Sequence, residues 1–590
     1  MKKLFKLILY AAFCFIYVAC GNEKPDSIVD EDVKKPEVTF SITPIENLNQ
    51  GQTEINSHAQ VISHSSLKMN FRSYIDLGQS ALGVSNPNYP RIKKMANGSF
   101  IMFYHNNQIG ASCNYAISQN LKMWISKGKL LTNYAIVDGN NEANERRFST
   151  CDALVLTNGD IIAVASYRAN VGYKEKPLDA GIVMLRSKDN GISWSTPIEI
   201  YRGVNWEPSL LQLPTGEIQC YFTDSSRTLY EGTDTGTAMI VSNDLGVTWA
   251  PSFGNNPYYV IRTKHTKDGK TYFNDQMPVA IKLNGTNELA AAVEANIGQY
   301  YISLAYSGDD GKWDQLTVTQ EGPVDKNDFA FEGSAPYIVQ FPSGETILSY
   351  NKSSTFFMKM GDAKARNFGE AYSPFTGKGY WGSMERIDAH QLIGVMPNTS
   401  SGVVMLSKFI LNHDITATNR KITVDGDNSE WKNTDQALFV GEKSQAQATL
   451  RCSFDENNVY FLIETLDDVL SVDDYSCIYV SPLSSSALSE KSCKIKVSHQ
   501  GLKGTYNFKT DWVVADFSVL ANAKYKGEVA NIYDKDYGYV VEVAVPRSKL
   551  NIESGKVRVN LSLYDKDGGL DAVSNLSSTN TANWIVVSGL

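Results

Sequence analysis

The clearest pattern of apolar and polar positions along this chain is a hairpin motif that occurs five times. Each copy has an apolar run, a turn with Asn-Gly, Thr-Gly or Ser-Gly, and a second run of alternating apolar residues, as in KKMANGSFIMFY and YIVQFPSGETILSY. Period-two alternation is typical of β-strands, and glycine permits the positive φ of a tight turn. The turn glycines are spaced 57 to 69 residues apart: Gly98, Gly159, Gly216, Gly285 and Gly344.

A second motif follows the hairpins. SKDNGISW (187–194) and SNDLGVTW (242–249) both read Ser-x-Asp-x-Gly-x-x-Trp, and degraded copies end at Trp124 and Trp313 and surround Phe368. The motif resembles the Asp-box, in which the Asp caps backbone N–H groups of a turn and the Trp packs between neighbouring sheets. We therefore interpret the Asp and Trp of the two full copies as structural residues that hold turns: Asp189, Trp194, Asp244 and Trp249.

A repeat of about 60 residues with four strands is typical of a propeller blade. We predict six four-stranded blades, the sixth combining residues 391–411 with an early strand near 71–77, which closes the ring. After residue 412 the pattern changes to other strands, among them CSFDENNVYFLIETLDD and YGYVVEVAVP. The predicted fold is therefore all-β: a six-bladed β-propeller over residues 58–412, followed by a β-sandwich domain over residues 413–590.

The first twenty residues are predicted to be a signal peptide. Lys2, Lys3 and Lys6 precede an apolar run that is long enough for a signal but short for a membrane span. The run ends in Tyr-Val-Ala-Cys, which resembles a bacterial lipobox with Cys20 as the acylated residue. An ordinary signal peptide or an uncleaved anchor is the alternative. We expect an exported lipoprotein of the outer membrane, cell surface or periplasm, with a polar tether over residues 21–57.

Composition and charge narrow the function classes. The 55 Lys and Arg against 64 Asp and Glu give a net charge of −9, which disfavours nucleic acid as a partner. The eight Cys form no Cys-x-x-Cys pair and the His are scattered, so we predict no metal site, no cofactor and mostly buried free thiols.

Function in a propeller is expected at the axis, where the first strand of each blade begins and the second ends. The residues at these positions are nearly all polar, and polar groups near a core must be satisfied by one another or by a ligand. The predicted first-strand positions are Arg91, Asp152, Glu207, Gln276 and Glu332, and the second-strand positions are His105, Arg168, Asp224, Glu294 and Asn351.

Such a ring of carboxylates and arginines suits glycoside hydrolysis. One carboxyl group protonates the leaving oxygen, and another either attacks the anomeric carbon or activates water. Charges that pair across the axis merely to seal the channel are the alternative. Glu207 lies between Trp206 and Pro208, and apolar neighbours raise a carboxyl pKa, so it is the predicted proton donor.

The segments YPRI, EPSLLQLPTGEIQCYFTD and MPVAIKL resemble the sialidase superfamily, and within it exo-acting arabinanases and sialidase-like bacterial enzymes. The resemblance implies Glu207 as acid/base, Glu294 as nucleophile, and Arg91 as the arginine of a Phe-Arg-Ile-Pro-like motif. Sialidases use three arginines for the sialate carboxylate. Here Arg91 and Arg168 are candidates and a third is not evident, so the substrate stays open between arabinan-like and sialoside-like ends.

The C-terminal part, from Asp-Gly-x-x-x-Glu-Trp at residues 425–431 onward, resembles family-9-type carbohydrate-binding modules. Trp431, Trp512 and Trp584 are candidates to stack on a sugar ring, with core packing as the alternative. The sequence leaves two hypotheses: an exo-glycosidase acting on a polysaccharide or glycan, or a non-catalytic glycan-binding lipoprotein held at the membrane by Cys20.

Overall fold

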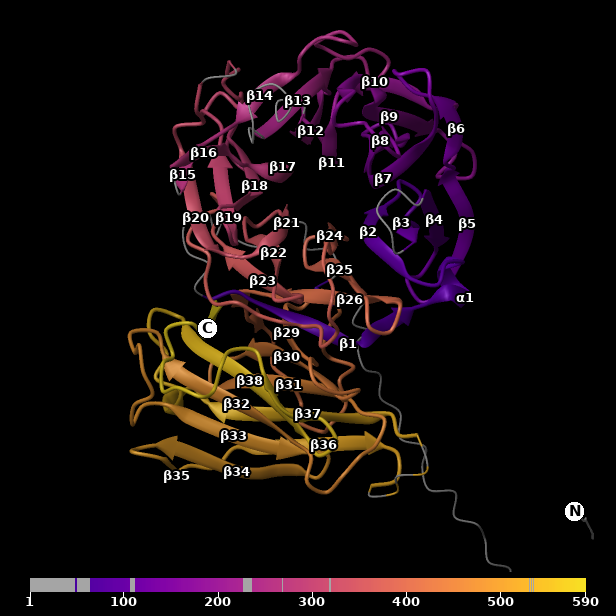
Figure 1. Cartoon of the computed structure of the whole chain (residues 1–590). Coiled ribbons are helices and arrows are strands. Elements are labelled where there is room, and N and C mark those ends of the chain that lie inside the picture. Colours follow the sequence, from indigo (N-terminus) through magenta and orange to yellow (C-terminus); the bar gives the residue numbers. More distant parts are fainter. Residues whose placement is uncertain are drawn as a thin grey trace, which may run out of the picture. The chain divides into compact units, whose positions relative to one another are not determined.

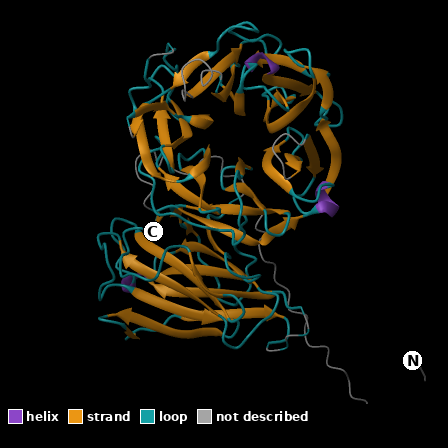
Figure 2. Ribbon diagram, in the orientation of Figure 1, coloured by secondary structure: helices purple, strands orange, loops and turns teal. Residues whose placement is uncertain are grey.

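The computed structural model describes residues 48–49, 64–106, 112–225, 236–267, 269–317, 320–529, 531, 533 and 535–590. Residues 40–590 form one compact unit. The predicted signal peptide, Cys20 and nearly all of the predicted tether lie outside the described residues. Nearly all of the regular secondary structure is strand, as Figure 2 shows, with one short helix, α1 (Gln79–Leu82), besides two 3₁₀ turns in the described residues.

Six sheets form the propeller, arranged in a ring around a common axis (Figure 1). From the innermost strand outward, the first blade is β2 (Pro87–Lys94), β3 (Phe100–Asn106), β4 (Cys113–Ser118) and β5 (Trp124–Leu131). The second is β7 (Ala143–Val155), β8 (Ile161–Ala169), β9 (Ala180–Ser187) and β10 (Ile198–Arg202), with β6 (Tyr134–Val137) as a fifth strand beside β7.

The third blade is β11 (Asn205–Gln212), β12 (Ile218–Asp224), β13 (Gly236–Ser242) and β14 (Tyr258–Ile261), after which β15 (Lys264–Lys267) and β16 (Lys270–Phe273) form a separate hairpin. The fourth blade is β17 (Gln276–Lys282), β18 (Leu289–Asn296), β19 (Tyr300–Tyr306) and β20 (Lys326–Glu332). The fifth is β21 (Ser334–Gln340), β22 (Thr346–Lys352) and β23 (Thr355–Gly361).

The sixth blade joins the two ends of the propeller. Its strands are β24 (Ser383–Arg386), β25 (Gln391–Asn398), β26 (Val403–Asn412) and β1 (Ser66–Leu77), and β1 pairs antiparallel with β26. The predicted closure of the ring is therefore confirmed. The prediction of four strands in every blade is wrong for two blades. The second blade has five strands, because β6 extends its sheet. The fifth blade has three, and an isolated bridge from Met358 to Tyr372 takes the place of its outer strand.

The sequence motifs have the predicted geometry. All five turn glycines have positive φ, from 72° at Gly285 to 111° at Gly344. In the second blade Asp189 accepts hydrogen bonds from Ser187 Oγ (2.8 Å) and Ser193 N–H (2.9 Å). The Ser193 hydroxyl, which donates to Asp189 Oδ2 (2.5 Å), contributes most to lowering the pKa of Asp189 to about 2, and the other two bonds add to it. Trp194 packs edge-on against Phe103 and Tyr115 of the first blade, so this turn joins adjacent sheets.

Apolar side chains fill the space between neighbouring blades. Between the second and third, for example, Ile162 and Val164 meet Cys220 and Phe222 in one cluster. Hydrophobic burial of this kind is the main force that holds one blade against the next. Six cysteines lie in the described part of the chain, and all of them are free and buried: Cys113, Cys151, Cys220, Cys452, Cys477 and Cys493.

Residues after 412 form a β-sandwich of two sheets. One contains β27 (Ile415–Thr416), β40 (Ile585–Ser588), β38 (Val557–Asp565), β32 (Tyr475–Pro482), β33 (Cys493–Ser498), β34 (Gly501–Phe508), β35 (Trp512–Val514) and β39 (Gly569–Ala572). The other contains β28 (Thr418–Asn419), β30 (Gln447–Phe454), β31 (Asn458–Leu466), β37 (Gly538–Pro546), β36 (Leu520–Lys526) and β29 (Ala437–Val440).

Two of the three tryptophans considered for sugar stacking belong to the interior of this domain. Trp431 is buried and donates its indole N–H to Glu542 (2.9 Å), and Trp584 is buried against Tyr479. Trp512 is partly exposed, and the Lys494 ammonium lies 4.9 Å from its ring centre. Among the described residues, no helix has the length and apolar character that a membrane crossing requires.

Candidate active site

A bulge at the same place in five of the six inner strands shapes the axial end of the propeller. In five blades two residues of the inner strand have no partner on the second strand, and the first of the two has a left-handed backbone. These residues are Tyr89, Thr150, Glu207, Met277 and Ala335, with φ between 48° and 53°, and Trp381 precedes β24 with φ 67°.

Positive φ is uncommon outside glycine, so six instances at one level of a repeat mark a built feature. Tyr89, Met277, Ala335 and Trp381 pack in one cluster although they come from four blades. Bulge residues therefore meet at the axis. Glu207 occupies this position in the third blade, so the fold directs its carboxyl group towards the same place.

The surroundings of Glu207 favour its protonated form. Burial raises its pKa to about 8, and the charge of Glu294 contributes in the same direction, whereas Arg91 and Arg168 oppose the shift. Thr223 Oγ1 accepts the Met277 N–H (2.8 Å) and donates to Glu207 Oε2 (3.3 Å). Glu207 as a residue is partly exposed. Its carboxyl group is nevertheless fixed by a hydrogen bond and desolvated, as the carboxyl group of a general acid is expected to be.

Glu294 lies on β18 of the next blade and is buried. Its Oε2 accepts the backbone N–H of Ala335 (2.6 Å), and Oε1 has no hydrogen-bond partner among the described residues. Burial raises the pKa of Glu294 to about 7, and the Ala335 N–H opposes that shift. The two carboxyl groups predicted from the sequence are therefore brought together, with the higher pKa at Glu207.

Two arginines predicted at the axis also lie near Glu207. Arg91 is buried, its guanidinium stacks 3.7 Å from the ring centre of Tyr89, and Nη1 donates to the Trp381 carbonyl (2.9 Å). Arg168 stacks 4.2 Å from the ring centre of Trp206. Positive charge at this place offsets the cost of an ionised carboxylate in a desolvated site.

A cavity of about 600 Å³ opens beside Glu294. Three predicted site residues line it, Glu294, Glu332 and Asn351, together with the aromatic residues Tyr300, Tyr380 and Trp381. A volume of this size holds a few sugar rings or a drug-sized molecule. Aromatic faces next to carboxylates are suited to a sugar, since rings stack on the apolar faces of pyranoses and furanoses while polar groups bind the hydroxyls.

Other predicted residues lie at different positions from those expected. Glu332 ends β20, the outermost strand of the fourth blade, so its placement on an inner strand is wrong; Gly333 separates it from β21. It still lines the cavity, where Lys352 pairs with it at 2.6 Å. Gln276 precedes the bulge, pairs with Glu294 across the sheet, and donates to Asn274 Oδ1 (3.0 Å).

Three more predicted residues are engaged inside the protein. Asp152 is 2% exposed and pairs with the Lys93 ammonium (3.3 Å), and Asp224 is buried and accepts from the Tyr201 hydroxyl (3.1 Å). His105 stacks on Tyr89 at 5.6 Å, and burial together with Arg91 lowers its pKa to about 4. These contacts fit support of the site better than direct contact with a ligand.

Several residues that complete the axial end were not predicted from the sequence. Lys93 also donates to the Tyr337 hydroxyl (2.8 Å). Burial raises the pKa of the Glu385 carboxyl, and the charge of Lys93 opposes that shift. Lys93 follows Arg91 by two residues, so strand alternation could have found it. Trp381 and Tyr380 lie in the segment between β23 and β24, where no periodicity marks them.

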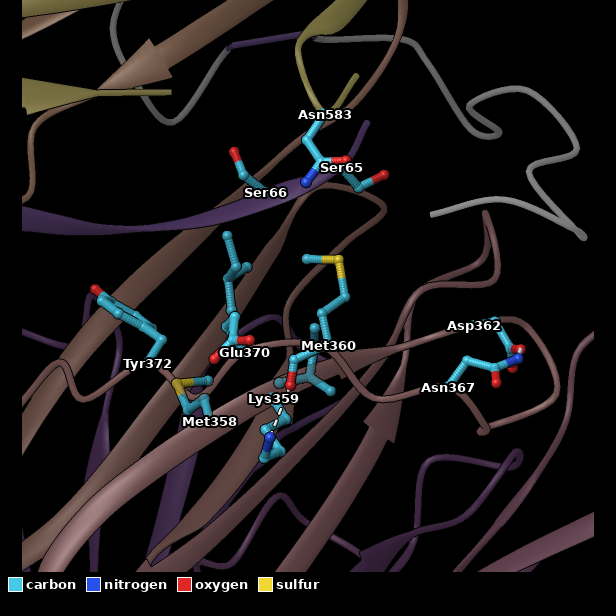
Figure 3. A pocket seen from close by; sticks show the side chains of 13 residues that line it. Ser65, Ser66, Met358, Lys359, Met360, Asp362, Asn367, Glu370, Tyr372 and Asn583 are labelled. Carbon is cyan, nitrogen blue, oxygen red and sulfur yellow. Dashed lines mark hydrogen bonds between the residues drawn. The ribbon is translucent and has the colours of Figure 1, made fainter. Parts of the chain in front are cut away.

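A second cavity, of about 590 Å³, is drawn in Figure 3, and none of the predicted axial site residues lines it. Leu67, Met358, Met360 and Tyr372 give it an apolar wall. Its acids are Asp362 and Glu370, and Asp362 already accepts the backbone N–H groups of Lys364 and Arg366. This cavity offers no pair of available carboxyl groups for hydrolysis.

Comparisons with known proteins identify similar structures only. No protein-family model matches the chain, and no curated protein matches it in sequence. A protein of unknown function from Dyadobacter fermentans is 14% identical, with 60% of this chain and all of that chain covered and a TM-score of 0.43. The GH93 α-L-arabinofuranosidase of Fusarium graminearum is 16% identical, with 58% and 98% covered and a TM-score of 0.40. The Hadza microbial sialidase Hz136 is 12% identical, with 55% and 65% covered and a TM-score of 0.39.

Proposed function

We propose that this protein is an exo-acting glycoside hydrolase that removes terminal sugars from a polysaccharide or glycan. The observation that carries the proposal is the pair of carboxyl groups at the axis, Glu207 and Glu294, whose pKa values lie near 8 and 7. Between these two values, at about pH 7.5, such a pair holds about one proton. Cleavage of a glycosidic bond needs one carboxylic acid and one carboxylate on the two sides of the bond.

In this mechanism Glu207 donates its proton to the leaving oxygen. Thr223, fixed by the Met277 N–H, holds the Glu207 carboxyl in place. Glu294 then either attacks the anomeric carbon or activates a water molecule, using Oε1 while Oε2 stays on the Ala335 N–H. Arg91 and Arg168 stabilise negative charge at Glu207 after proton transfer.

The cavity beside Glu294 is the proposed sugar site. Trp381 and Tyr300 offer ring faces, Asn351 and the Glu332–Lys352 pair offer polar groups, and all five line one space. Arabinan-like and sialoside-like chain ends are the two substrate classes to test.

The test is release of sugar by the purified full chain from arabinans, sialosides and pectic fragments. We expect the wild type to release a single sugar from one substrate class, and Glu207→Gln and Glu294→Gln each to lower the rate of release by at least about 10²-fold. Glu217→Gln, in the turn between β11 and β12, is a matched control that should keep activity. Full activity of both axial variants would refute the proposed mechanism.

A non-catalytic glycan-binding protein is the second candidate, and one observation favours it. Glu294 occupies a position where other blades use neutral side chains for the same contact: Thr223 accepts the Met277 N–H, and Asn351 accepts the Trp381 N–H (3.2 Å). A structural contact alone could therefore explain Glu294. Binding of a glycan without turnover by the wild type, and unchanged binding by Glu294→Gln, would establish this candidate.

We also propose that the protein is held at a membrane surface through acylated Cys20, as its lipobox-like sequence suggests. A Cys20→Ala variant should lose metabolic labelling with a fatty acid and should move from the membrane fraction to the soluble fraction of a bacterial host. Labelling that persists in this variant would contradict the proposed anchor.

A further inference from the structure

Three buried aspartates lie together in the C-terminal sandwich. Asp467 directly follows β31, Asp474 directly precedes β32, and Asp565 ends β38. One carboxylate oxygen of each lies within 4.8 Å of the other two. The three residues are 3%, 1% and 4% exposed.

The cluster joins the two layers of the sandwich. β31 belongs to the sheet of β30 and β37, whereas β32 and β38 are adjacent strands of the other sheet. A ligand shared by the three carboxylates would therefore connect both sheets at the loop over residues 467–474.

Positive charge is missing from this cluster. Among the described residues, no lysine or arginine forms an ion pair with any of the three aspartates, and nearby Lys566 pairs with Asp473 instead (3.2 Å). Burial raises the pKa of Asp467 to about 8, with further contributions from Asp474 and Asp565. Buried carboxylates without a cation or full hydrogen bonding are costly.

The hydrogen bonds leave oxygens available. Asp474 accepts the Lys566 N–H (3.0 Å) and the Ser471 N–H, and Asp565 Oδ1 accepts the Asp567 N–H (2.9 Å). Asp467 Oδ1 accepts the Val469 N–H (3.0 Å), but Asp467 Oδ2 is buried with no hydrogen-bond partner among the described residues. An unsatisfied buried oxygen beside two further carboxylates is what a cation site provides.

We propose that Asp467, Asp474 and Asp565 bind a calcium ion that ties the two sheets of the sandwich together. Carboxylate oxygens are hard ligands, and oxygens up to about 4.8 Å apart can share an ion at about 2.4 Å from each. Ca²⁺ accepts irregular sites with backbone carbonyls as further ligands, whereas Mg²⁺ keeps several waters, for which a site this buried has little room.

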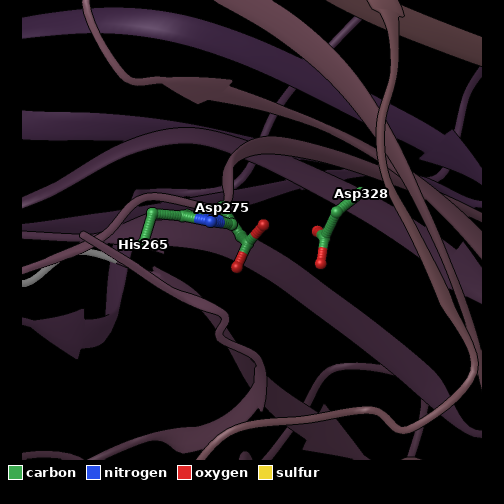
Figure 4. A group of neighbouring side chains, drawn as sticks. All are labelled: His265, Asp275 and Asp328. Atoms are coloured by element: carbon green, nitrogen blue, oxygen red, sulfur yellow. The ribbon is translucent and has the colours of Figure 1, made fainter. Parts of the chain in front are cut away.

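The other group of possible metal ligands serves as the matched control. His265, Asp275 and Asp328 also lie close together (Figure 4). There, however, the Lys326 ammonium donates to Asp275 Oδ1 (2.6 Å) and to Asp328. A lysine already supplies the positive charge, so we expect no ion at that group.

The experiment uses the full chain after treatment with EDTA. Excess Ca²⁺ should raise the Tm of the C-terminal domain by about 5–10 °C, the shift that saturation of one tight site gives in a domain of this size. Tb³⁺ should show emission sensitised by Tyr475 and Tyr564, which adjoin Asp474 and Asp565, and Ca²⁺ should displace it. Asp467→Asn should weaken Tb³⁺ binding at least about tenfold, and Asp328→Asn should leave it unchanged.

Hydrogen exchange locates the ion without any variant, which matters if Asp467→Asn fails to fold. Ca²⁺ should protect peptides spanning residues 466–475 and 560–568 of the wild type. No Ca²⁺-dependent Tm shift, protection confined to other peptides, or unchanged Tb³⁺ affinity in a folded Asp467→Asn protein would each overturn the proposal.

Discussion

The backbone N–H of Ala335 donates a 2.6 Å hydrogen bond to Glu294 Oε2 across the boundary between the fourth and fifth blades. Ala335 lies at the bulge, with φ 53°, so the fold fixes this donor. The donor favours the ionised form of Glu294 and opposes the effect of burial. Among the described residues, the Glu207 carboxyl has only the Thr223 hydroxyl as a hydrogen-bond partner, and this difference supports the assignment of Glu207 as acid and Glu294 as carboxylate.

Glu294→Gln should lower kcat by at least about 10²–10⁴-fold while leaving the Tm nearly unchanged. A glutamine oxygen can still accept the Ala335 N–H, as the Asn351 amide oxygen accepts the Trp381 N–H, but it can neither attack nor remove a proton. Steady-state kinetics and calorimetry measure the two effects. A large loss of Tm with little loss of kcat would mean that Glu294 is purely structural.

Azide rescue should separate the roles of the two carboxyl groups if the enzyme retains configuration. With an activated substrate, Glu294→Ala should form a glycosyl azide of inverted configuration, because azide takes the place of the nucleophile. Glu207→Ala should form one of retained configuration, because azide attacks the covalent intermediate. NMR of the products identifies the anomers, and the opposite pairing would exchange the two roles.

The pH dependence of kcat/KM should be bell-shaped, with its maximum between about pH 7 and 8. Activity should rise with pH as Glu294, whose pKa lies near 7, becomes ionised, and fall as Glu207, whose pKa lies near 8, loses its proton. Because the two carboxyl groups interact, the acidic and alkaline limbs of the profile report apparent pKa values that belong to the pair. In Glu207→Gln the alkaline limb should disappear from the residual activity; an unchanged alkaline limb would assign it to another group.

The repeat could be predicted from the sequence because each hairpin carries its own local signal. A glycine at positive φ between two alternating runs fixes a turn wherever the rest of the chain lies. The position of each site residue relative to the bulge in its inner strand could not be predicted in the same way. Arg91 and Asp152 lie two residues beyond the bulge residue, Glu207 is the bulge residue itself, and Gln276 precedes it, so residues read as equivalent occupy three different positions.

A signal for the bulge was nevertheless present. Proline follows the bulge residue in four of the five blades that have a bulge, at Pro90, Pro208, Pro278 and Pro336, and proline is rare inside a paired strand. Glu207 could have been aligned with Tyr89 by this residue alone. The cavity wall at Tyr380 and Trp381 had no such signal, because it belongs to an irregular segment whose place depends on tertiary packing.

Gly344→Ala should destabilise the propeller more than Gly98→Ala. Both glycines have positive φ, so alanine costs about 1–2 kcal/mol at either one. A Cβ at Gly98 would meet nothing within 4 Å, whereas at Gly344 it would lie 2.8 Å from the Cβ of Ala363. The overlap should add about 1 kcal/mol or more. Thermal unfolding compares the two variants. Equal Tm values would show that the loop at Ala363 moves away from the new Cβ without a loss of stability.

Glu207→Gln should stabilise the protein at alkaline pH and have little effect at pH 5. The pKa of Glu207 is about 8 in the folded protein, well above the ordinary value of 4.5, so the folded state keeps a proton that the unfolded state has already lost. Stability therefore falls as pH rises from about 4.5 towards 8, and glutamine, which stays neutral, avoids that loss. Because Glu207 is partly exposed, we expect a gain of only about 1–3 kcal/mol at pH 8.5. Chemical unfolding at pH 5 and 8.5 measures the difference, with Glu217→Gln as the control that should show none. A gain of the same size at both pH values would mean that the effect comes from packing, and that the Glu207 carboxyl is not held in its protonated form.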